Sequence, residues 1–240
     1  MVRPDKLNSL DESMVDAFHA ALDGAAEARA VVVTAEGRAF SAGRDLSAAE
    51  PLTEDAEAIL RNTFNPLLQR IYDIEVPTIA AVQGACLGVG FGIAFACDLV
   101  VAATDAKLGS PFARIGAVLD SGGHRYLVER LGAHRALELI YTGRLLTGEE
   151  AAAAGLVNRA VSGDELREQV MELARTIAAG PTEAFRESKR IVRGLAAEQA
   201  TLAAVLAAEG AAQGRIARSA DYAEGISAFQ DKRTPTFTGR

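Results

Sequence analysis

Two loops of small residues could do chemistry through their backbone. FSAGRDL occupies residues 40–46 and QGACLGVGFG occupies residues 83–92, and each is expected between a strand and a helix. Backbone N–H groups at a helix N-terminus point outward and carry partial positive charge. Two such groups that converge from separate loops can bind an oxygen that becomes negative during a reaction. The spacing therefore indicates an oxyanion hole, and the alternative is that the glycines serve only close packing of helix on strand.

A carboxylate in apolar surroundings is the second candidate. Asp120 lies in FARIGAVLDSGGHRYL, at 112–127, between an apolar run and a Gly-Gly pair. An apolar pocket raises the pKa of a carboxyl group, which suits a general base. A turn residue or a helix N-cap is the competing interpretation of the same aspartate.

Three better-known sites do not fit these glycines. Gly88, Gly90 and Gly92 spell GxGxG in mid-chain, whereas a dinucleotide site needs GxGxxG after an early strand. A P-loop is excluded as well, because no Gly-Lys-Ser/Thr follows these glycines. Ser121 has Leu119 two residues before it, where a hydrolase elbow needs glycine.

Composition limits the partners of the protein. The chain has 240 residues, a formal net charge of −7 and 49% hydrophobic residues, with no basic run. Nucleic acid and anionic membranes are therefore poor partners, and general disorder is unexpected. Cys86 and Cys97 with three scattered histidines support neither a disulfide framework nor a zinc site, so we expect no metal and two buried thiols. Free thiols are typical of a reducing compartment, and the N-terminal residues do not resemble a signal peptide. We therefore expect the protein in the cytoplasm.

The elements that position these loops follow from apolar patterning. Ser9 and Glu12 have capping-box spacing before a helix, and 54–72 has an apolar helical face, from Ile59 to Ile71. Apolar runs predict buried strands at 30–35, 76–82, 98–103 and 156–161, with a turn at 83–87 and a helix at 88–97. Residues 78–97 lack formal charge, but their glycines and Gln83 argue against a membrane helix. Alternating strands and helices predict a largely parallel α/β sheet.

The last third of the chain is expected to be helical. Few strand signals follow about residue 163, and Gly180-Pro181 separates two helices. The Ala-rich run 195–212 is expected to be packed helix, with a flexible segment as the alternative. We predict a core at 1–180 and a C-terminal helical region of the same fold at 181–240.

Several motifs, in order and spacing, resemble the crotonase family, also called the enoyl-CoA hydratase/isomerase superfamily. The resemblance runs nearly end to end. It is carried by RPDKLNSL at 3–10, FSAGRDL at 40–46, PTIAAVQGACLGVGFGIAFACDLVVA at 77–102, AKLGSPFARIGAVLDSGG at 106–123, RLGAHRALELIYTGRLLTGEEAAAAGLVNRAV at 130–161 and FQDKRTPTF at 229–237.

This resemblance implies a crotonase (ClpP-like) fold, a spiral of ββα repeats with a C-terminal helical region. It implies acyl-CoA thioester substrates, no cofactor beyond the coenzyme A of the substrate, and a homotrimer or a dimer of trimers. The oxyanion hole is expected at the N–H groups of Ala42 and Val89. The coenzyme A contacts are expected at Arg44, Asp45, Leu46, Lys6, Lys232 and Arg233, although a solvated surface is the alternative for the basic residues. Candidates to line the acyl pocket are Phe112, Phe91, Phe64 and Tyr126, with core packing as the alternative.

The catalytic positions depart from the hydratase pattern. Hydratases of the family carry two glutamates, and the matching positions here are Gly92 and Phe112. Asp120 stands instead where hydratases begin a Gly-rich turn. That arrangement is similar to the PaaG-type isomerases of phenylacetate breakdown and to single-carboxylate enoyl-CoA isomerases.

One carboxylate suffices to shift a double bond, because it removes a proton and returns it two carbons along. We therefore expect an enoyl-CoA isomerase with Asp120 as the proton shuttle. The alternatives are an enoyl-CoA hydratase, an enzyme that uses Asp120 as a nucleophile, and a non-catalytic acyl-CoA-binding protein. Fatty-acid and aromatic-acid degradation both fit this chemistry.

Overall fold

A computed structural model of the chain describes residues 1–25, 27–47, 55–198, 214–215 and 218–239. The chain separates into two compact units. The first comprises Met1–Ala26, Val32–Asp73 and Thr78–Met171, and the second comprises Glu27–Val31, Ile74–Pro77 and Glu172–Arg240. All elements that carry Ala42, Val89 and Asp120 belong to the first unit, whereas the helical region expected at 181–240 lies within the second.

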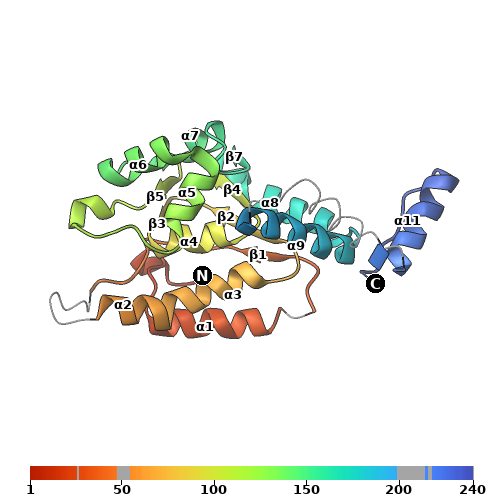
Figure 1. Cartoon of the computed structure of the whole chain (residues 1–240), viewed down its shortest axis with the longest axis horizontal. Helices are drawn as coiled ribbons and strands as arrows, with labels where there is room; N and C mark the ends of the chain where they lie inside the picture. The colour runs from red at the N-terminus through yellow and green to blue at the C-terminus, as the bar shows by residue number, and fades with distance from the viewer. Residues whose placement is uncertain (26, 48–54, 199–213, 216–217, 240) are drawn as a thin grey trace. The chain divides into compact units, whose positions relative to one another are not determined.

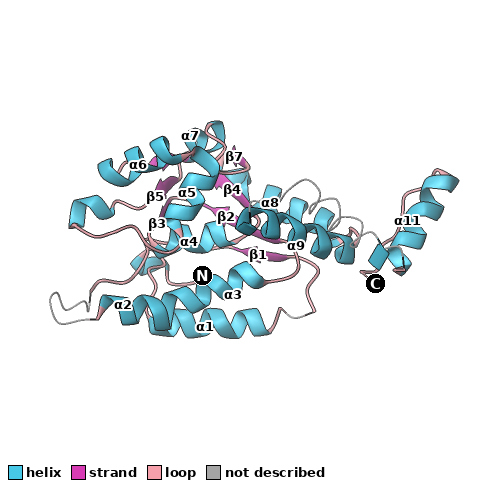
Figure 2. Cartoon of the chain, viewed as in Figure 1, coloured by secondary structure: helices cyan, strands magenta, loops and turns pink. Residues whose placement is uncertain are grey.

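The principal sheet has the order β1-β2-β4-β7 (Figures 1 and 2). Its strands are β1 (Val31–Val33), β2 (Thr78–Val82), β4 (Leu99–Ala103) and β7 (Arg159–Val161). β4 pairs in parallel with both β2 and β7. Every residue of β2 is buried, as expected for a strand covered on both faces. The four apolar runs thus form one sheet, which is parallel where β4 joins β2 and β7, and each strand is shorter than its run.

A second, small sheet was not predicted. β3 (Ala85–Leu87) pairs in parallel with β5 (Lys107–Gly109), and β5 pairs antiparallel with β6 (Leu146–Thr147). The expectation of a turn throughout 83–87 is therefore wrong for its last three residues. Strands this short show too few side chains for a period-two pattern, and their partners lie far along the chain. With helix α4 (Val89–Ala96), β2 and β3 form one ββα turn of the expected crotonase spiral.

Helix α1 (Glu12–Asp23) begins later than its capping pattern indicated. Its N-cap is Asp11, whose side chain accepts a hydrogen bond from the Met14 N–H at 2.9 Å. The prediction of a Ser9 cap is wrong because Leu10 is paired with another loop: its N–H donates to the Gly43 carbonyl at 2.8 Å. Leu10 is therefore held in a β-bridge to Arg44, and the helix cannot begin before Asp11.

The predicted helix over 54–72 is found as three consecutive segments over its described residues. They are α2 (Ala56–Ile59), a π-helical segment η2 (Leu60–Phe64) and α3 (Asn65–Asp73). The apolar face is buried as expected at Phe64, Leu67, Leu68 and Ile71.

The first unit contains further helices in its C-terminal half. They are η3 (Phe112–Ile115), α5 (Gly123–Leu131), α6 (Ala133–Thr142), α7 (Gly148–Ala153) and the start of α8 (Gly163–Ala178). The second unit contains the end of α8, α9 (Thr182–Glu198) and α11 (Ala220–Asp231). As predicted, Gly180-Pro181 separates α8 from α9, whereas most of the Ala-rich run 195–212 lies outside the described residues.

Arg29 ties the second unit together internally. Its guanidinium donates to the Thr182 hydroxyl at 2.9 Å and to the Phe237 carbonyl at 3.1 Å. A residue near the N-terminus thereby joins the start of α9 to the C-terminal tail.

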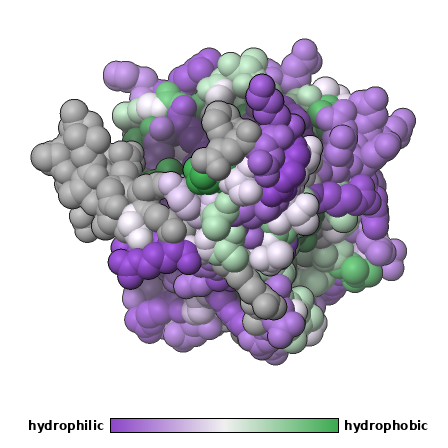
Figure 3. Space-filling view, turned by 90° about the vertical axis from the view of Figure 1, so that its right-hand side faces the viewer, coloured by the Kyte–Doolittle hydropathy of each residue, from purple (hydrophilic) through white to green (hydrophobic). Residues whose placement is uncertain are grey.

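Within the described part of the chain, no helix has the length and apolar content needed to cross a bilayer. The stretch 78–97 is divided between β2, β3 and α4. The face drawn in Figure 3 is largely hydrophilic, with apolar residues in small separate groups.

Both cysteines are predicted to react slowly with a thiol reagent in the native protein. Cys86 in β3 is fully buried and Cys97 after α4 is 3% exposed. Burial raises the pKa of the Cys86 thiol, which disfavours the reactive thiolate. Titration with a chromogenic disulfide should therefore release little colour from native protein and two equivalents after denaturation. Rapid release of even one equivalent from the native protein would contradict this burial.

Candidate active site

The N-terminus of α4 is the first component of the candidate site. Its N-cap, Gly88, has a φ of +52°, and its own N–H donates to the Gly109 carbonyl at 3.3 Å. No side chain of the described residues caps this helix. The N–H groups of its first turn, which begins at Val89, therefore supply the partial positive charge that an oxyanion needs.

The loop 40–46 packs directly against this helix N-terminus. A Cβ atom at Gly90 would lie 2.6 Å from the Ser41 Cβ, and a Cβ atom at Gly43 would lie 3.0 Å from the Leu87 carbonyl oxygen. Glycine at these two positions therefore permits the close approach. The predicted meeting of the two loops is confirmed, and the glycines also serve the packing that was the alternative explanation.

One expected donor of the oxyanion hole is already bonded. The Ala42 N–H donates to the Leu7 carbonyl at 2.9 Å. The turn Pro4–Lys6 brings Leu7 to this loop, with Leu7 in a left-handed conformation. The prediction that the Ala42 N–H holds a substrate oxygen is therefore wrong, because that N–H is used to hold the loop in place.

Asp120 lies in the loop before α5 and is half-buried. It follows the buried Leu119, and its Oδ1 accepts a hydrogen bond of 2.7 Å from the Ser121 hydroxyl. Its carbonyl accepts from the Gly123 N–H at 2.9 Å, which closes a turn. The N-cap of α5 is Gly122, so Asp120 does not serve as the helix cap.

Burial raises the pKa of the Asp120 carboxyl, while the Ser121 hydrogen bond and the positive charge of Arg44 oppose that shift. The carboxyl pKa is thus above its ordinary value, in the direction that makes the carboxylate a stronger base. The charged side chain of Arg44, carried by the loop 40–46, is thus within electrostatic reach of the Asp120 carboxyl.

The raised pKa predicts opposite effects of Asp120 on activity and on stability. Activity that needs the ionised base should fall as the pH drops through the raised pKa. A group whose pKa is higher folded than unfolded stabilises the fold below its unfolded pKa, and that contribution is lost as the pH rises through the folded value. At neutral pH Asp120→Asn should therefore melt at the same temperature or higher, with this gain absent near pH 3. A lower melting temperature at neutral pH would contradict the desolvation of Asp120.

The two positions that lack glutamate are both in this site. A Cβ atom at Gly92 would lie 2.6 Å from the Ser121 carbonyl oxygen and 2.7 Å from the Ser121 Cβ, so the backbone after Asp120 fills that space. The Phe112 ring lies at the helix N-terminus, where a Cβ atom at Gly88 would be 3.4 Å from two ring carbons. The Phe112 ring and the Ser121 backbone thus occupy the two places where hydratases of the family are expected to carry glutamates.

A cavity of about 450 Å³ adjoins Phe112 and the residue before Asp120. Its walls come from η3, the following loop, α5 and α6. The lining residues are Ser110, Phe112, Ala113, Ala117, Val118, Leu119, His124, Leu137, Ile140 and Tyr141. This mostly apolar lining suits an acyl chain.

The other aromatic candidates lie elsewhere. Phe91 stacks on Phe95, with ring centroids 4.1 Å apart, and adjoins a much smaller cavity of about 10 Å³. Tyr126 packs beside Phe95 and is 8% exposed, and burial raises the pKa of its hydroxyl to about 12. Phe64 is 3% exposed in η2. Tyr126 and Phe64 are thus core residues, as the alternative reading held, and of the four aromatic candidates only Phe112 adjoins the larger cavity.

The expected coenzyme A residues of the loop 40–46 differ in their environments. Asp45 bonds the Ser47 N–H at 3.0 Å and pairs with Arg3 at 2.9 Å. These interactions lower the Asp45 carboxyl pKa to about 2, with the Ser47 bonds the larger cause. Leu46 is 56% exposed, and Lys6 is exposed in the turn that precedes Leu7.

Lys232 and Arg233 belong to the second unit. There Arg233 donates to both carboxylate oxygens of Glu224, at 2.6 and 2.8 Å. This pairing occupies the Arg233 guanidinium within its own unit. Lys232 is exposed beside it, with a φ of +56°.

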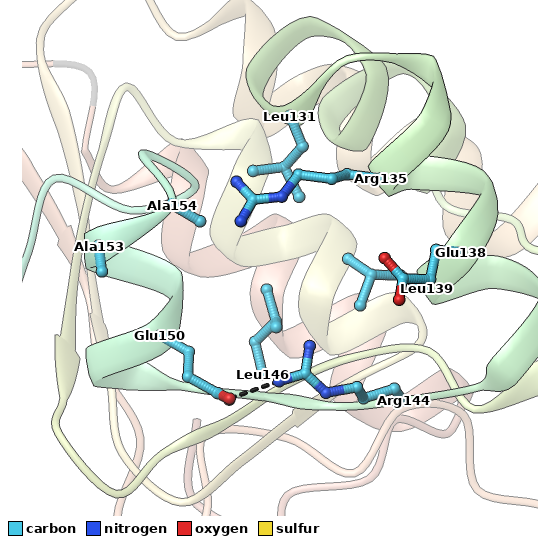
Figure 4. Close-up of a pocket in the computed structure, with 9 residues that line it drawn as sticks. All are labelled: Leu131, Arg135, Glu138, Leu139, Arg144, Leu146, Glu150, Ala153 and Ala154. Atoms are coloured by element: carbon cyan, nitrogen blue, oxygen red, sulfur yellow. Dashed lines mark hydrogen bonds and ion pairs between the residues drawn. The ribbon is translucent and has the colours of Figure 1, made fainter.

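A separate pocket of about 260 Å³ lies between α6 and α7 (Figure 4). Leucine side chains face it together with Arg135, Glu138 and an ion pair between Arg144 and Glu150. It contains none of the residues that the sequence indicated as functional.

Sequence reasoning missed the role of Ser121 as a partner of Asp120. Ser121 was considered only as a hydrolase nucleophile, and that possibility was rejected. Its place next to Asp120 in LDSGG was the one available signal, because adjacent polar side chains in a turn often bond one another.

Comparison with known proteins gives a consistent result. Residues 1–240 match a family model described as enoyl-CoA hydratase/isomerase. A Rhodobacter capsulatus protein named "Probable enoyl-CoA hydratase" is 41% identical over 99% of this chain and 92% of its own length. The 1,2-epoxyphenylacetyl-CoA isomerase of Escherichia coli is 34% identical over 99% of this chain and 93% of its own. A solved enoyl-CoA hydratase structure from Polaromonas superposes with a TM-score of 0.91 at 30% identity, covering 98% of this chain and 93% of that one.

Proposed function

Because the chain belongs to the enoyl-CoA hydratase/isomerase family, we propose that it is an enoyl-CoA isomerase with Asp120 as its single proton shuttle. The observation that carries this proposal is the environment of Asp120. Its carboxyl is half-buried, and Arg44 is the charged group that acts on it; among the described residues no second carboxylate influences it.

The proposed reaction moves one proton and one double bond. Asp120 takes a proton from C2 of a 3-enoyl thioester, and the electron pair passes into the thioester carbonyl to give an enolate. The same carboxyl then returns the proton to C4, which places the double bond between C2 and C3. Nothing is consumed, so one base of raised pKa is sufficient.

The enolate oxygen needs hydrogen-bond donors, and α4 supplies the first through the Val89 N–H. We place the second at the Arg44 N–H in place of Ala42. The loop approaches α4 closely at Gly43, and Arg44 follows it within electrostatic reach of Asp120. One such donor is typically worth about 3–4 kcal/mol of transition-state stabilisation.

Addition of water to a 2-enoyl thioester is the alternative, and the names of several relatives favour it. That reaction needs a positioned water as well as a proton for carbon. The Phe112 ring at the N-terminus of α4 makes this part of the site apolar, which disfavours a bound water. The cavity beside Phe112 is proposed to receive the acyl chain.

A paired turnover assay with product identification tests the proposal. The protein is supplied separately with a 3-enoyl-CoA and with a 2-enoyl-CoA, and products are separated by chromatography. Formation of the 2-enoyl isomer without 3-hydroxyacyl-CoA is the expected result. Accumulation of 3-hydroxyacyl-CoA from the 2-enoyl substrate would establish a hydratase and overturn the single-base mechanism.

A further inference from the structure

We propose that Ser121 is a positioning residue for Asp120, holding one carboxylate oxygen so that the other is presented to the substrate. This inference deepens the proposed isomerase function and rests on it for the identity of the base. It concerns a side chain that neither the motif pattern nor the names of the relatives single out.

The hydrogen bond itself is well placed for this role. The Ser121 hydroxyl donates to Oδ1 of Asp120 at 2.7 Å, a length typical of a strong bond to a carboxylate. Ser121 is 5% exposed, so water does not compete freely for this hydroxyl. Because Oδ1 is engaged, Oδ2 is the oxygen left to collect and return the proton.

The backbone of Ser121 is held in an unusual conformation. Its φ is +56°, in the left-handed region that non-glycine residues seldom adopt. Its carbonyl oxygen and Cβ lie where a side chain at Gly92 would be, so this segment packs directly against the first turn of α4. Such strain persists where the surroundings impose it, and it clusters at functional sites.

Of the four elements considered next to the Asp120 loop, three carry charged or titratable groups. Arg44 in the loop 40–46 acts on the carboxyl, while α4 carries no ionisable side chain over Val89–Ala96. On α5, His124 is exposed and Arg125 pairs with Glu129 at 2.6 Å. On η3, Arg114 is exposed. The Ser121 bond is therefore, with Arg44, one of two interactions that keep this desolvated carboxyl ionised.

The experiment compares Ser121→Ala and Ser121→Gly with the wild-type enzyme. Both variants lose the hydroxyl, but only glycine relaxes the left-handed backbone. We expect both to lower kcat about tenfold with little change in KM, and to move the acid limb of the pH profile up by about one unit, since a hydrogen bond to a charged group is lost. The Asp120 pKa is also measured directly, from the side-chain carboxyl ¹³C signal that disappears in Asp120→Asn.

Ser13→Ala is the matched control. The Ser13 hydroxyl donates to Asp11 at 2.8 Å, which is a similar bond at the exposed start of α1. Its removal should leave the acid limb in place. An unchanged Asp120 pKa in both Ser121 variants, or full activity in Ser121→Gly, would overturn the positioning role. Because the ¹³C titration requires no turnover, it decides this role even if the wild-type enzyme proves not to isomerise enoyl-CoA.

Discussion

Asp120→Asn is expected to lower kcat for double-bond migration by about 10²–10⁴-fold, the contribution of a positioned general base. Asparagine preserves the size of the side chain and can still accept the Ser121 hydroxyl through its amide oxygen. It cannot accept a proton from C2 of the thioester. KM should change little, since the loops proposed to bind the oxyanion are untouched. The measurement is the steady-state turnover of a 3-enoyl-CoA, monitored as loss of this substrate and formation of the 2-enoyl product.

Asp105→Asn provides a control for general loss of negative charge. Asp105 is exposed in the turn between β4 and β5. That variant should retain wild-type turnover. If Asp120→Asn kept more than a tenth of the activity, Asp120 would not be the proton shuttle.

Gly92→Ala is the second change with a large expected effect. The new methyl group would meet the Ser121 carbonyl and Cβ at less than 3 Å, and both belong to the segment that carries Asp120. Overpacking of this kind costs about 1–3 kcal/mol of stability. Displacement of a catalytic group by about 1 Å costs about 10²-fold in rate. We therefore expect turnover to fall more than the melting temperature alone would suggest, as measured by kcat beside a thermal melt.

Gly194→Ala is the corresponding control in α9, where an added Cβ meets nothing within 4 Å. It should leave turnover unchanged. Gly92→Glu, which restores the residue type that hydratases carry, is expected to lose isomerisation without gaining hydration, because Ser121 already fills the space. Wild-type turnover in Gly92→Ala would show that the Asp120 segment is free to move away from α4.

The sequence was sufficient for the features that depend on local pattern. The apolar β-branched runs form β1, β2 and β4. A strand that is buried on both faces is apolar along its whole length, so the local sequence is enough to predict it. The apolar run that follows Gly88 forms the buried helix α4, which was likewise predicted from the local sequence. Order and spacing of motifs along the chain identified the family, and the apolar neighbours of Asp120 indicated the direction in which its pKa is shifted.

Other features depend on which distant residues meet, and only the tertiary structure decided them. The strands β3, β5 and β6 are too short to carry a period of their own. The sequence does not tell whether Phe64 or Phe112 lines a pocket. In the structure Phe64 lies in the core, whereas Phe112 adjoins a cavity. Ala42 matches the motif position expected for an oxyanion donor, yet its N–H donates to the Leu7 carbonyl. A backbone N–H has no side-chain signature, so whether it serves the fold or a substrate is decided by the partner that folding brings to it.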